Sequence, residues 1–246
     1  MPSFDSTGVR IHYLDEGTGP PVVLVHGLTS SAENNWRRPG TIGALVGAGH
    51  RVVALDCRGH GESEKPHDAS SYGGTTMGDD VVALMDHLGI DVADLVGYSM
   101  GGVIATSLLS RRVERFRRVI IAGVGDWVLR PGSTSRPGGN RTRRVGPVRG
   151  AIRKFLLQRV AQRISNDPEA LAAMRAAERR VLDPQTLGAV RCPVLILVGR
   201  DDRGARPTDK LAAAIPGARI VTVPGNHLTA VVNPEFRRAI VDFLKP

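Results

Sequence analysis

The stretch Gly97-Tyr98-Ser99-Met100-Gly101 is the most informative part of this sequence. It follows an apolar run at residues 91–96 and leads into residues 102–109, whose composition is typical of a helix. A pattern this short recurs by chance in a chain with 29 glycines. The prediction therefore depends on the strand pattern before it and the helix pattern after it. A serine between two glycines, at the junction of a strand and a helix, indicates a nucleophile elbow, because the tight turn leaves no room for bulky neighbours. The sequence therefore predicts Ser99 as a nucleophile.

A serine hydroxyl is a weak nucleophile and needs an adjacent base, which a carboxylate in turn orients. In a chain with this elbow, the expected order is serine, then acid, then histidine. His227 is the only histidine after Ser99, and it follows a strand pattern at residues 219–223. Asp202 follows the buried strand pattern of residues 193–199. Both lie just past a strand's carboxyl end, where an open parallel sheet places its ligands, so we expect Asp202 and His227 beside Ser99.

The identity of the acid stays open at this point. Asp202 is the preferred candidate, Asp201 is its neighbour, and Asp126 follows another strand pattern at residues 119–122. The alternative interpretation of each aspartate is a turn residue that caps its own backbone.

An oxyanion that develops during acyl transfer needs hydrogen-bond donors. With a nucleophile elbow these are the backbone N–H after the nucleophile and one from an earlier loop. The first is that of Met100, and the second is assigned to Leu28, in a loop that follows the buried strand pattern of residues 21–25. His26 lies in the same loop, and we interpret it as a brace of that loop rather than as a catalytic base.

These motifs, together with Asp56-Cys57-Arg58-Gly59-His60-Gly61-Glu62-Ser63 and Gly225-Asn226-His227, resemble the α/β-hydrolase family from about residue 9 to the C-terminus. The resemblance implies an α/β fold: a mostly parallel central sheet of about eight strands flanked by helices, with a small helical cap between strands six and seven. It also implies a structural role for Arg58. Met100 after the nucleophile is similar to the esterase and cofactor-free haloperoxidase or perhydrolase branch. Epoxide hydrolases and haloalkane dehalogenases of the family carry aspartate where this chain has Ser99.

The chain divides into a hydrolase core, expected at residues 1–126 and 191–246, and a basic cap at residues 127–190. Within the cap, residues 130–140 are rich in Gly, Pro and Ser and predict a loop, and helices are predicted at residues 148–163 and 168–181. Basic residues crowd the first part of the cap with no acid between them: Arg141, Arg143, Arg144, Arg149, Arg153, Lys154, Arg159 and Arg163. They predict either a solvated face or a rim that attracts anionic substrates or membrane surfaces.

Composition narrows the function classes. A chain of 246 residues buries a sizeable core as one domain, and only two cysteines imply no disulfide framework, so we expect a cytoplasmic protein. No run of 18 apolar residues and no signal peptide is visible. The net charge is +9, but the basic part of the cap lacks the aromatics that stack on bases, so no nucleic-acid partner is expected. The seven histidines are scattered, and neither a metal nor a cofactor is expected.

The predicted function is that of a serine hydrolase, carboxylesterase-like, that cleaves a carboxylic ester or related acyl bond of a small-to-medium, possibly anionic substrate. Ser99, His227 and Asp202 act through an acyl-enzyme. An apolar acyl pocket is predicted from Trp36, Trp127 and Leu228, with the side chains of Leu28 and Met100 and an apolar cap stripe at residues 155–164. Alternatives within enzymes are perhydrolysis, thioester cleavage and C–C bond hydrolysis. A different class is a non-catalytic binder of a small ligand on the same fold.

Overall fold

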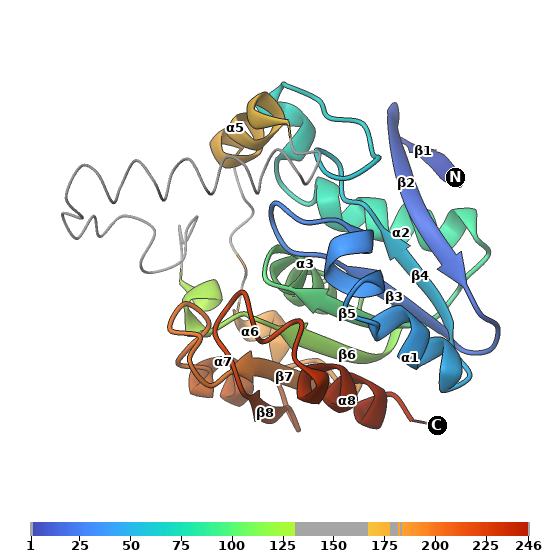
Figure 1. The fold of residues 1–246 in the computed structure, drawn as a ribbon. Coiled ribbons are helices and arrows are strands. Elements are labelled where there is room, and N and C mark those ends of the chain that lie inside the picture. Colours follow the sequence, from blue (N-terminus) through green and yellow to red (C-terminus); the bar gives the residue numbers. More distant parts are fainter. Residues whose placement is uncertain (1, 131–166, 178–181, 183, 246) are drawn as a thin grey trace, which may run out of the picture.

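The computed structural model describes residues 2–130, 167–177, 182 and 184–245. These residues form an eight-stranded sheet with the strand order β1-β2-β4-β3-β5-β6-β7-β8 (Figure 1). The strands are β1 Ser3–Ser6, β2 Val9–Glu16, β3 Pro21–Val25, β4 Arg51–Leu55, β5 Ala93–Tyr98, β6 Phe116–Ala122, β7 Val194–Gly199 and β8 Arg219–Val223.

Only the first two pairings of the sheet are antiparallel. The hairpin of β1 and β2 turns at Thr7 and Gly8, whose φ angles of 52° and 80° give the left-handed turn that joins twisted strands directly. β2 then pairs antiparallel with β4, and every later neighbour is parallel. The mostly parallel sheet predicted from the sequence is confirmed.

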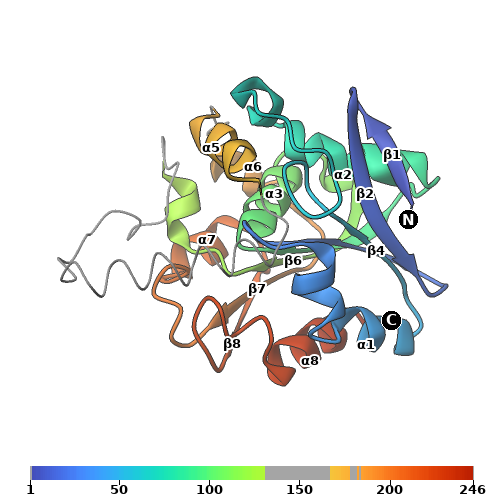
Figure 2. The ribbon, with the colours of Figure 1, turned by 45° about the horizontal axis from the view of Figure 1, so that its top comes forward.

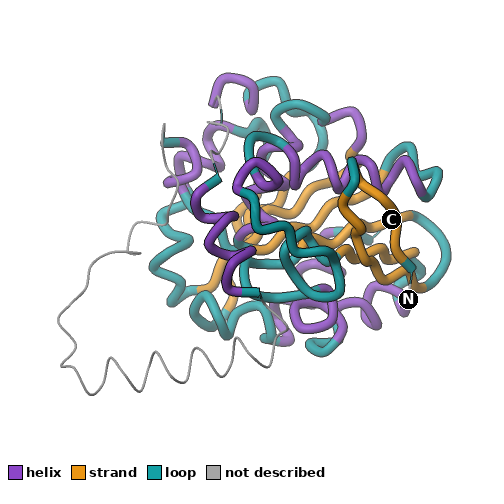
Figure 3. The backbone as a smooth tube through the Cα atoms, turned by 90° about the horizontal axis from the view of Figure 1, so that it is seen from above, coloured by secondary structure: helices purple, strands orange, loops and turns teal. Residues whose placement is uncertain are grey.

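Helices cover both faces of the sheet because its central strands are apolar on both sides, and β5 and β7 are buried along their whole length. Figures 2 and 3 show strands between two helical layers. One core cluster lies under α2, α3, α6 and α7, and the other lies under α1 and α8. The helices of the two layers are α1 Thr41–Gly47, α2 Thr76–His87, α3 Met100–Leu109, α6 Pro184–Leu187, α7 Asp209–Ala214 and α8 Pro234–Phe243.

Several helical segments have no counterpart in the sequence patterns, among them the short turn η1, Glu33–Arg37, and helix α1. The sequence of α1 contains Gly43 and Gly47, and glycine weakens a helix by about 1 kcal/mol relative to alanine. The helix forms because Ile42 and Leu45 are fully buried beneath the sheet, so tertiary packing overrides a weak local preference.

The region predicted as a cap, residues 127–190, is described only in part. Its helix α5, Pro168–Ala176, begins as predicted: Asp167 is the N-cap, and its side chain accepts hydrogen bonds from the backbone N–H groups of Glu169 and Ala170. The helix ends before the predicted boundary, and residues 178–181 lie outside the described residues. The predicted helix at 148–163, the basic residues of the cap and most of the predicted loop also lie outside them.

None of the described helices combines the length and the apolar character that crossing a membrane requires.

The strand order creates a switch point in the middle of the sheet. From β3 the chain passes to β4 on one side, and β5 returns to pair with β3 on its other side. In an open parallel sheet, the loops that follow the strands at such a point leave a crevice between them, and ligands bind there. The loop after β3 and the turn after β5 both lie at this position.

Candidate active site

Ser99 sits in a strained turn between β5 and α3. Its φ and ψ angles are 54° and −107°, which a residue with a side chain rarely adopts. The turn is held by a hydrogen bond from the Ser99 N–H to the carbonyl of Ala122, 2.8 Å away. It closes only because glycine flanks it: a Cβ on Gly97 would lie 2.1 Å from the carbonyl oxygen of Gly101. This is the elbow geometry that the motif predicts.

His227 and Asp202 meet Ser99 from the loops after β8 and β7. The Ser99 Oγ lies 2.8 Å from Nε2 of His227, and Nδ1 of His227 lies 2.5 Å from Oδ2 of Asp202. The Asp202 side chain is only 1% exposed, and its Oδ1 accepts the backbone N–H groups of Gly204 and Ala205. Asp202 is therefore fixed in its own turn, and it can hold the histidine in one tautomer with Nε2 facing the hydroxyl.

The other two candidate acids lie elsewhere. Oδ1 of Asp126 accepts the backbone N–H of Leu211 at 2.9 Å, so this carboxylate supports the first turn of α7. Asp201 is exposed, and its backbone N–H bonds the carbonyl of Gly225. Across the part of the chain that the structure describes, the carboxylate that bonds His227 is that of Asp202.

The loop after β3 approaches the elbow closely. A Cβ on Gly27 would lie 3.4 Å from Cβ of Ser99, and the carbonyl of His26 accepts the N–H of Gly101 at 3.1 Å. Within the described residues, the backbone N–H groups of Leu28 and Met100 have no hydrogen-bond acceptor. The Met100 N–H belongs to the first turn of α3, where N–H groups have no partner inside the helix. Both expected oxyanion donors thus have an N–H without an acceptor in the part of the chain that the structure describes.

His26 braces this loop, as interpreted from the sequence. Its Nε2 accepts the Cys57 N–H at 3.0 Å, which leaves Nδ1 to donate to the carbonyl of Gly27 at 2.8 Å. Burial lowers the pKa of His26, which favours this neutral form. Neither ring nitrogen is left for proton transfer, so His26 has a structural role in this geometry.

A buried carboxylate ties the loops around His26 together. Asp56 accepts the backbone N–H of Ala32 at 2.7 Å and that of Glu62 at 2.9 Å, and Nδ1 of His12 donates to it at 2.9 Å. Burial alone would raise the pKa of Asp56, but the hydrogen bond from His12, the nearby His26 and the backbone donors lower it. The ionised carboxylate thus links the loop after β3 to the loop after β4.

The predicted pocket residues have three different surroundings. Trp36 is fully buried in the core cluster under α1 and α8, so the structure removes it from the pocket. Trp127 is 8% exposed in the cluster on the α3 face, which the Met100 side chain also contacts. Leu228 is 77% exposed directly after His227 and stays a candidate for the mouth of the site. The apolar cap stripe at residues 155–164 lies outside the described residues.

A contact that sequence reasoning missed joins helix α5 to the two expected oxyanion residues. The side chains of Leu28 and Met100 pack against a small apolar cluster made of Tyr72 and four residues of the α5 region: Ala170, Ala173, Met174 and Ala177. Only the apolar face of α5 could have suggested this, because the packing joins segments far apart in the sequence. Helix α5 thus lies next to both expected oxyanion residues.

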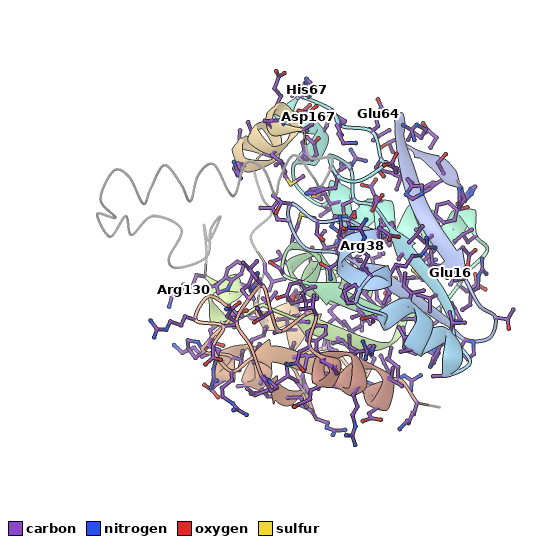
Figure 4. The ribbon with its side chains drawn as sticks, in the orientation of Figure 1. Glu16, Arg38, Glu64, His67, Arg130 and Asp167 are labelled. Carbon is purple, nitrogen blue, oxygen red and sulfur yellow. The ribbon has the colours of Figure 1, made fainter. Side chains whose placement is uncertain are left out.

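A polar contact anchors the start of the same helix. His67, in the loop after β4, lies beside Asp167 (Figure 4), with its Nε2 2.9 Å from Oδ2 of that residue. Its Nδ1 lies 3.1 Å from Oε2 of Glu169. The hydrogen bond to Asp167 raises the pKa of His67, and the same bond lowers the pKa of Asp167. Among the described residues, no group of three or more His, Cys, Asp and Glu side chains is arranged to hold a metal ion.

Comparison with known proteins gives concordant results. A family model described as alpha/beta hydrolase fold matches residues 20–144. An epoxide hydrolase from Caballeronia sordidicola is 36% identical over 114 residues, 46% of this chain and 34% of the relative. The chain thus spans only about a third of that relative's length. A 2-hydroxy-6-oxo-2,4-heptadienoate hydrolase from Pseudomonas putida is 32% identical over 216 residues, 80% of this chain and 77% of the relative.

A solved structure matches over the whole length. The enol-lactonase from Burkholderia xenovorans LB400 superposes with a TM-score of 0.76 at 28% identity and covers 100% of both chains. The family model includes β3, β5 and the elbow between β5 and α3, which are the parts that position Ser99. Since this model matches about half of the chain and one relative is matched across most of both lengths, the chain belongs to the α/β-hydrolase fold family.

Proposed function

We propose that this hydrolase cleaves a carboxylic ester, or a related acyl bond, of a small-to-medium substrate through an acyl-enzyme on Ser99. The observation that carries the proposal is the continuous hydrogen-bonded chain from Asp202 through His227 to the Ser99 hydroxyl. A hydroxyl, a base and an orienting carboxylate in this sequence are the groups that acyl transfer requires.

The chemistry follows from the proton positions. Nε2 of His227 takes the proton of Ser99 as Oγ attacks the carbonyl carbon, and Asp202 stabilises the imidazolium that results. The tetrahedral oxyanion accepts the N–H groups of Leu28 and Met100. As it collapses, the C–O bond to the leaving group breaks and Nε2 returns the proton to the alcohol. Water then attacks the acyl-Ser99 ester with His227 as base, which releases the acid and restores the hydroxyl.

The serine nucleophile is the reason for preferring an acyl bond over an epoxide, although one relative is named an epoxide hydrolase. Attack of Ser99 on an epoxide would leave an ether on Oγ. An ether has no carbonyl carbon for water to attack, so the enzyme would be blocked after one turnover. An ester, by contrast, gives an acyl-enzyme that water can cleave. A lactone is a cyclic ester, so the likeness to an enol-lactonase supports the same class of bond.

A second candidate is hydrolysis of a C–C bond next to a ketone. It is favoured by the relative named a 2-hydroxy-6-oxo-2,4-heptadienoate hydrolase, which matches across 80% of this chain. The same serine could attack the ketone, but the leaving group would be a carbanion that needs a proton on carbon. Ester cleavage stays the preferred function because it needs no further group than those that meet at Ser99.

Other parts of the proposal remain outside the described geometry. We retain residues 127–190 as the cap over a core of residues 1–126 and 191–246, and we propose that its basic part favours an anionic substrate. No cofactor takes part in the proposed reaction, and we propose a cytoplasmic enzyme that acts on a small molecule.

The test is hydrolysis of p-nitrophenyl esters from C2 to C12 by the wild type, Ser99→Ala and His227→Ala. We expect both variants to lose at least about 10³-fold in kcat, while the control Ser107→Ala, on the same helix, keeps wild-type activity. A fluorophosphonate probe should label the wild type and not Ser99→Ala. A dienoic ketone substrate measured in parallel decides between the two candidates.

Turnover of the ketone with no ester hydrolysis would select C–C cleavage. A wild type that neither turns over any substrate nor reacts with the probe would remove both candidates and leave a small-ligand binder.

A further inference from the structure

Tyr98, the residue before Ser99, joins the two halves of the proposed site. It is the last residue of β5 and is only 5% exposed. Its hydroxyl donates a hydrogen bond to the backbone carbonyl of His227, 129 positions along the chain. Its ring also lies against the His227 ring, with centroids 5.4 Å apart and planes tilted by 30°. One side chain therefore contacts both the backbone and the ring of the proposed base.

The Tyr98 ring is held on its other sides. The edge of Phe236, from α8, meets it at a centroid distance of 5.7 Å and an angle of 85°. A Cβ on Gly27 would lie 3.3 Å from Cδ1 of Tyr98, and a Cβ on Gly123 would lie 2.9 Å from Cε2. The loop after β3, the end of β6 and helix α8 thus enclose the ring, so the direction of its hydroxyl is fixed.

The loop that carries His227 is shaped mainly by local bonds. The side chain of Asn226 accepts the N–H groups of Leu228 and Thr229, and Thr229 Oγ1 accepts the N–H of Asn226. These bonds set the form of the loop but do not attach it to the strand that carries the nucleophile. The hydroxyl of Tyr98 makes that attachment, because Tyr98 and Ser99 are adjacent in the chain.

We propose that Tyr98 is a positioning residue that holds His227 at hydrogen-bonding distance from Ser99, an inference that rests on the proposed serine-hydrolase function. It acts through His227 and does not touch the substrate. Proton transfer between Oγ and Nε2 needs the 2.8 Å separation, and a displacement of about 1 Å can cost on the order of 10²-fold in rate. A smaller displacement follows from loss of one hydrogen bond, since the Asp202 bond and the ring contact remain.

The test compares Tyr98→Phe with the wild type. Phenylalanine keeps every ring contact, so the variant is expected to fold. We expect kcat for a p-nitrophenyl ester to fall about tenfold with KM within twofold, and the rate of fluorophosphonate labelling of Ser99 to fall by a similar factor. In the proton NMR spectrum, the low-field signal of the His227 Nδ1–H, assigned as the one lost in Asp202→Asn, should shift or broaden.

Tyr72→Phe is the matched control for lost stability. Tyr72 is also a buried tyrosine, and its hydroxyl donates to a backbone carbonyl, that of Pro66, at 2.6 Å. The Tyr72→Phe variant loses the same kind of hydrogen bond, but one that does not involve His227. It should therefore lower the melting temperature comparably and leave the low-field signal of His227 in place.

A second variant tests the hydroxyl without removing it. With Tyr98→3,5-difluorotyrosine, the more acidic hydroxyl loses its proton at a lower pH and then cannot donate to the carbonyl. We expect kcat of this protein to fall with rising pH in a range where the wild type is unaffected. A purely structural role for Tyr98 would produce no such additional pH dependence.

The outcomes separate the two proposals. Wild-type protein without labelling or turnover refutes the serine hydrolase itself. The positioning role alone is overturned if the wild type is active and the kcat and labelling rate of Tyr98→Phe change less than threefold. It is also overturned if the defect of Tyr98→Phe is confined to KM.

Discussion

The Asp202 carboxylate lies 2.5 Å from Nδ1 of His227, whereas Asp201, its neighbour in the chain, is exposed. The difference arises in the turn after β7. Two backbone N–H groups bind Oδ1 of Asp202 and direct its other oxygen toward the histidine. Of these two adjacent aspartates, Asp202 bonds the proposed base and Asp201 is exposed, so a variant of each serves as a control for the other.

Asp202→Asn should lower kcat roughly 10⁴-fold, because an amide that donates to Nδ1 favours the wrong histidine tautomer. Asp201→Asn should stay within about twofold of the wild type, as is usual for a change at an exposed side chain away from the reacting atoms. Ester hydrolysis at saturating substrate measures both. Equal losses in the two variants would contradict the assignment of the acid.

Gly123→Ala should damage the site by displacing the Tyr98 ring, which contacts His227. The added Cβ would lie 2.9 Å from Tyr98 Cε2, so the Tyr98 ring must shift, and it would be in van der Waals contact with His227 Cε1 at 3.4 Å. We expect kcat to fall about tenfold or more, since the separation of Oγ and Nε2 changes.

Gly89→Ala is the matched control for this change. Gly123 and Gly89 have almost the same backbone angle, with φ of +65° and +64°, but a Cβ on Gly89 meets nothing within 4 Å. Both variants should lose about 1 kcal/mol of unfolding free energy from the unfavourable φ. Only Gly123→Ala should lose activity, and a loss of activity in both would assign the effect to general instability.

Sequence patterns predicted those parts that depend on local chemistry. The buried strands follow from continuous apolar runs, the elbow follows from Gly97 and Gly101, and the start of α5 follows from Asp167 and Pro168. Arg58, whose structural role the family resemblance implied, forms a buried ion pair with Asp80 at 2.6 Å.

The remaining features depend on contacts between distant segments. Trp36 is of a residue type that often lines pockets, but only the packing under α1 and α8 shows that it belongs to the core. The bond from Tyr98 to His227 spans 129 positions and has no local signature. The packing of α5 on Leu28 and Met100 likewise joins segments that are far apart in the sequence. Such contacts depend on tertiary geometry, which residue spacing does not encode.

The attachment of α5 should depend on pH through His67 and Asp167. The pKa of His67 is raised, so its contact stabilises the folded state below the unfolded pKa, and this contribution is lost as pH rises through the folded pKa. The pKa of Asp167 is lowered, so its contribution is present above its unfolded pKa and is lost as pH falls through the folded pKa. The attachment is therefore strongest between these two folded-state values.

Amide hydrogen exchange measures this attachment. Corrected for intrinsic rates, exchange in α5 should speed up by up to about fivefold as pH rises through the folded pKa of His67, a modest factor because the pair is exposed. His67→Gln should remove this step, and amides of α8 serve as the internal control. An unchanged step in the variant would show that another group holds the helix.

His60 should make the fold sensitive to acid. The ring is fully buried, its Nδ1 donates to the carbonyl of Arg58 at 3.1 Å, and its centroid lies 5.1 Å from that of His26. Burial first, and then the neighbouring His26, lower the pKa of His60 to about 3. The native ring therefore stays neutral at a pH where the unfolded chain already binds a proton.

The sign of the effect follows from proton binding. Below the unfolded pKa of about 6.5, the unfolded state holds one more proton at this position than the native state. The free energy of unfolding therefore decreases as the pH is lowered from about 6.5 to about 3. One proton corresponds to a slope of about 1.4 kcal/mol per pH unit. His60→Asn keeps a donor for the Arg58 carbonyl but cannot be charged. Urea unfolding between pH 6 and 4 should therefore show a slope smaller by about one proton than in the wild type, even if the variant is less stable at neutral pH; equal slopes would show that the His60 ring is protonated in the native state.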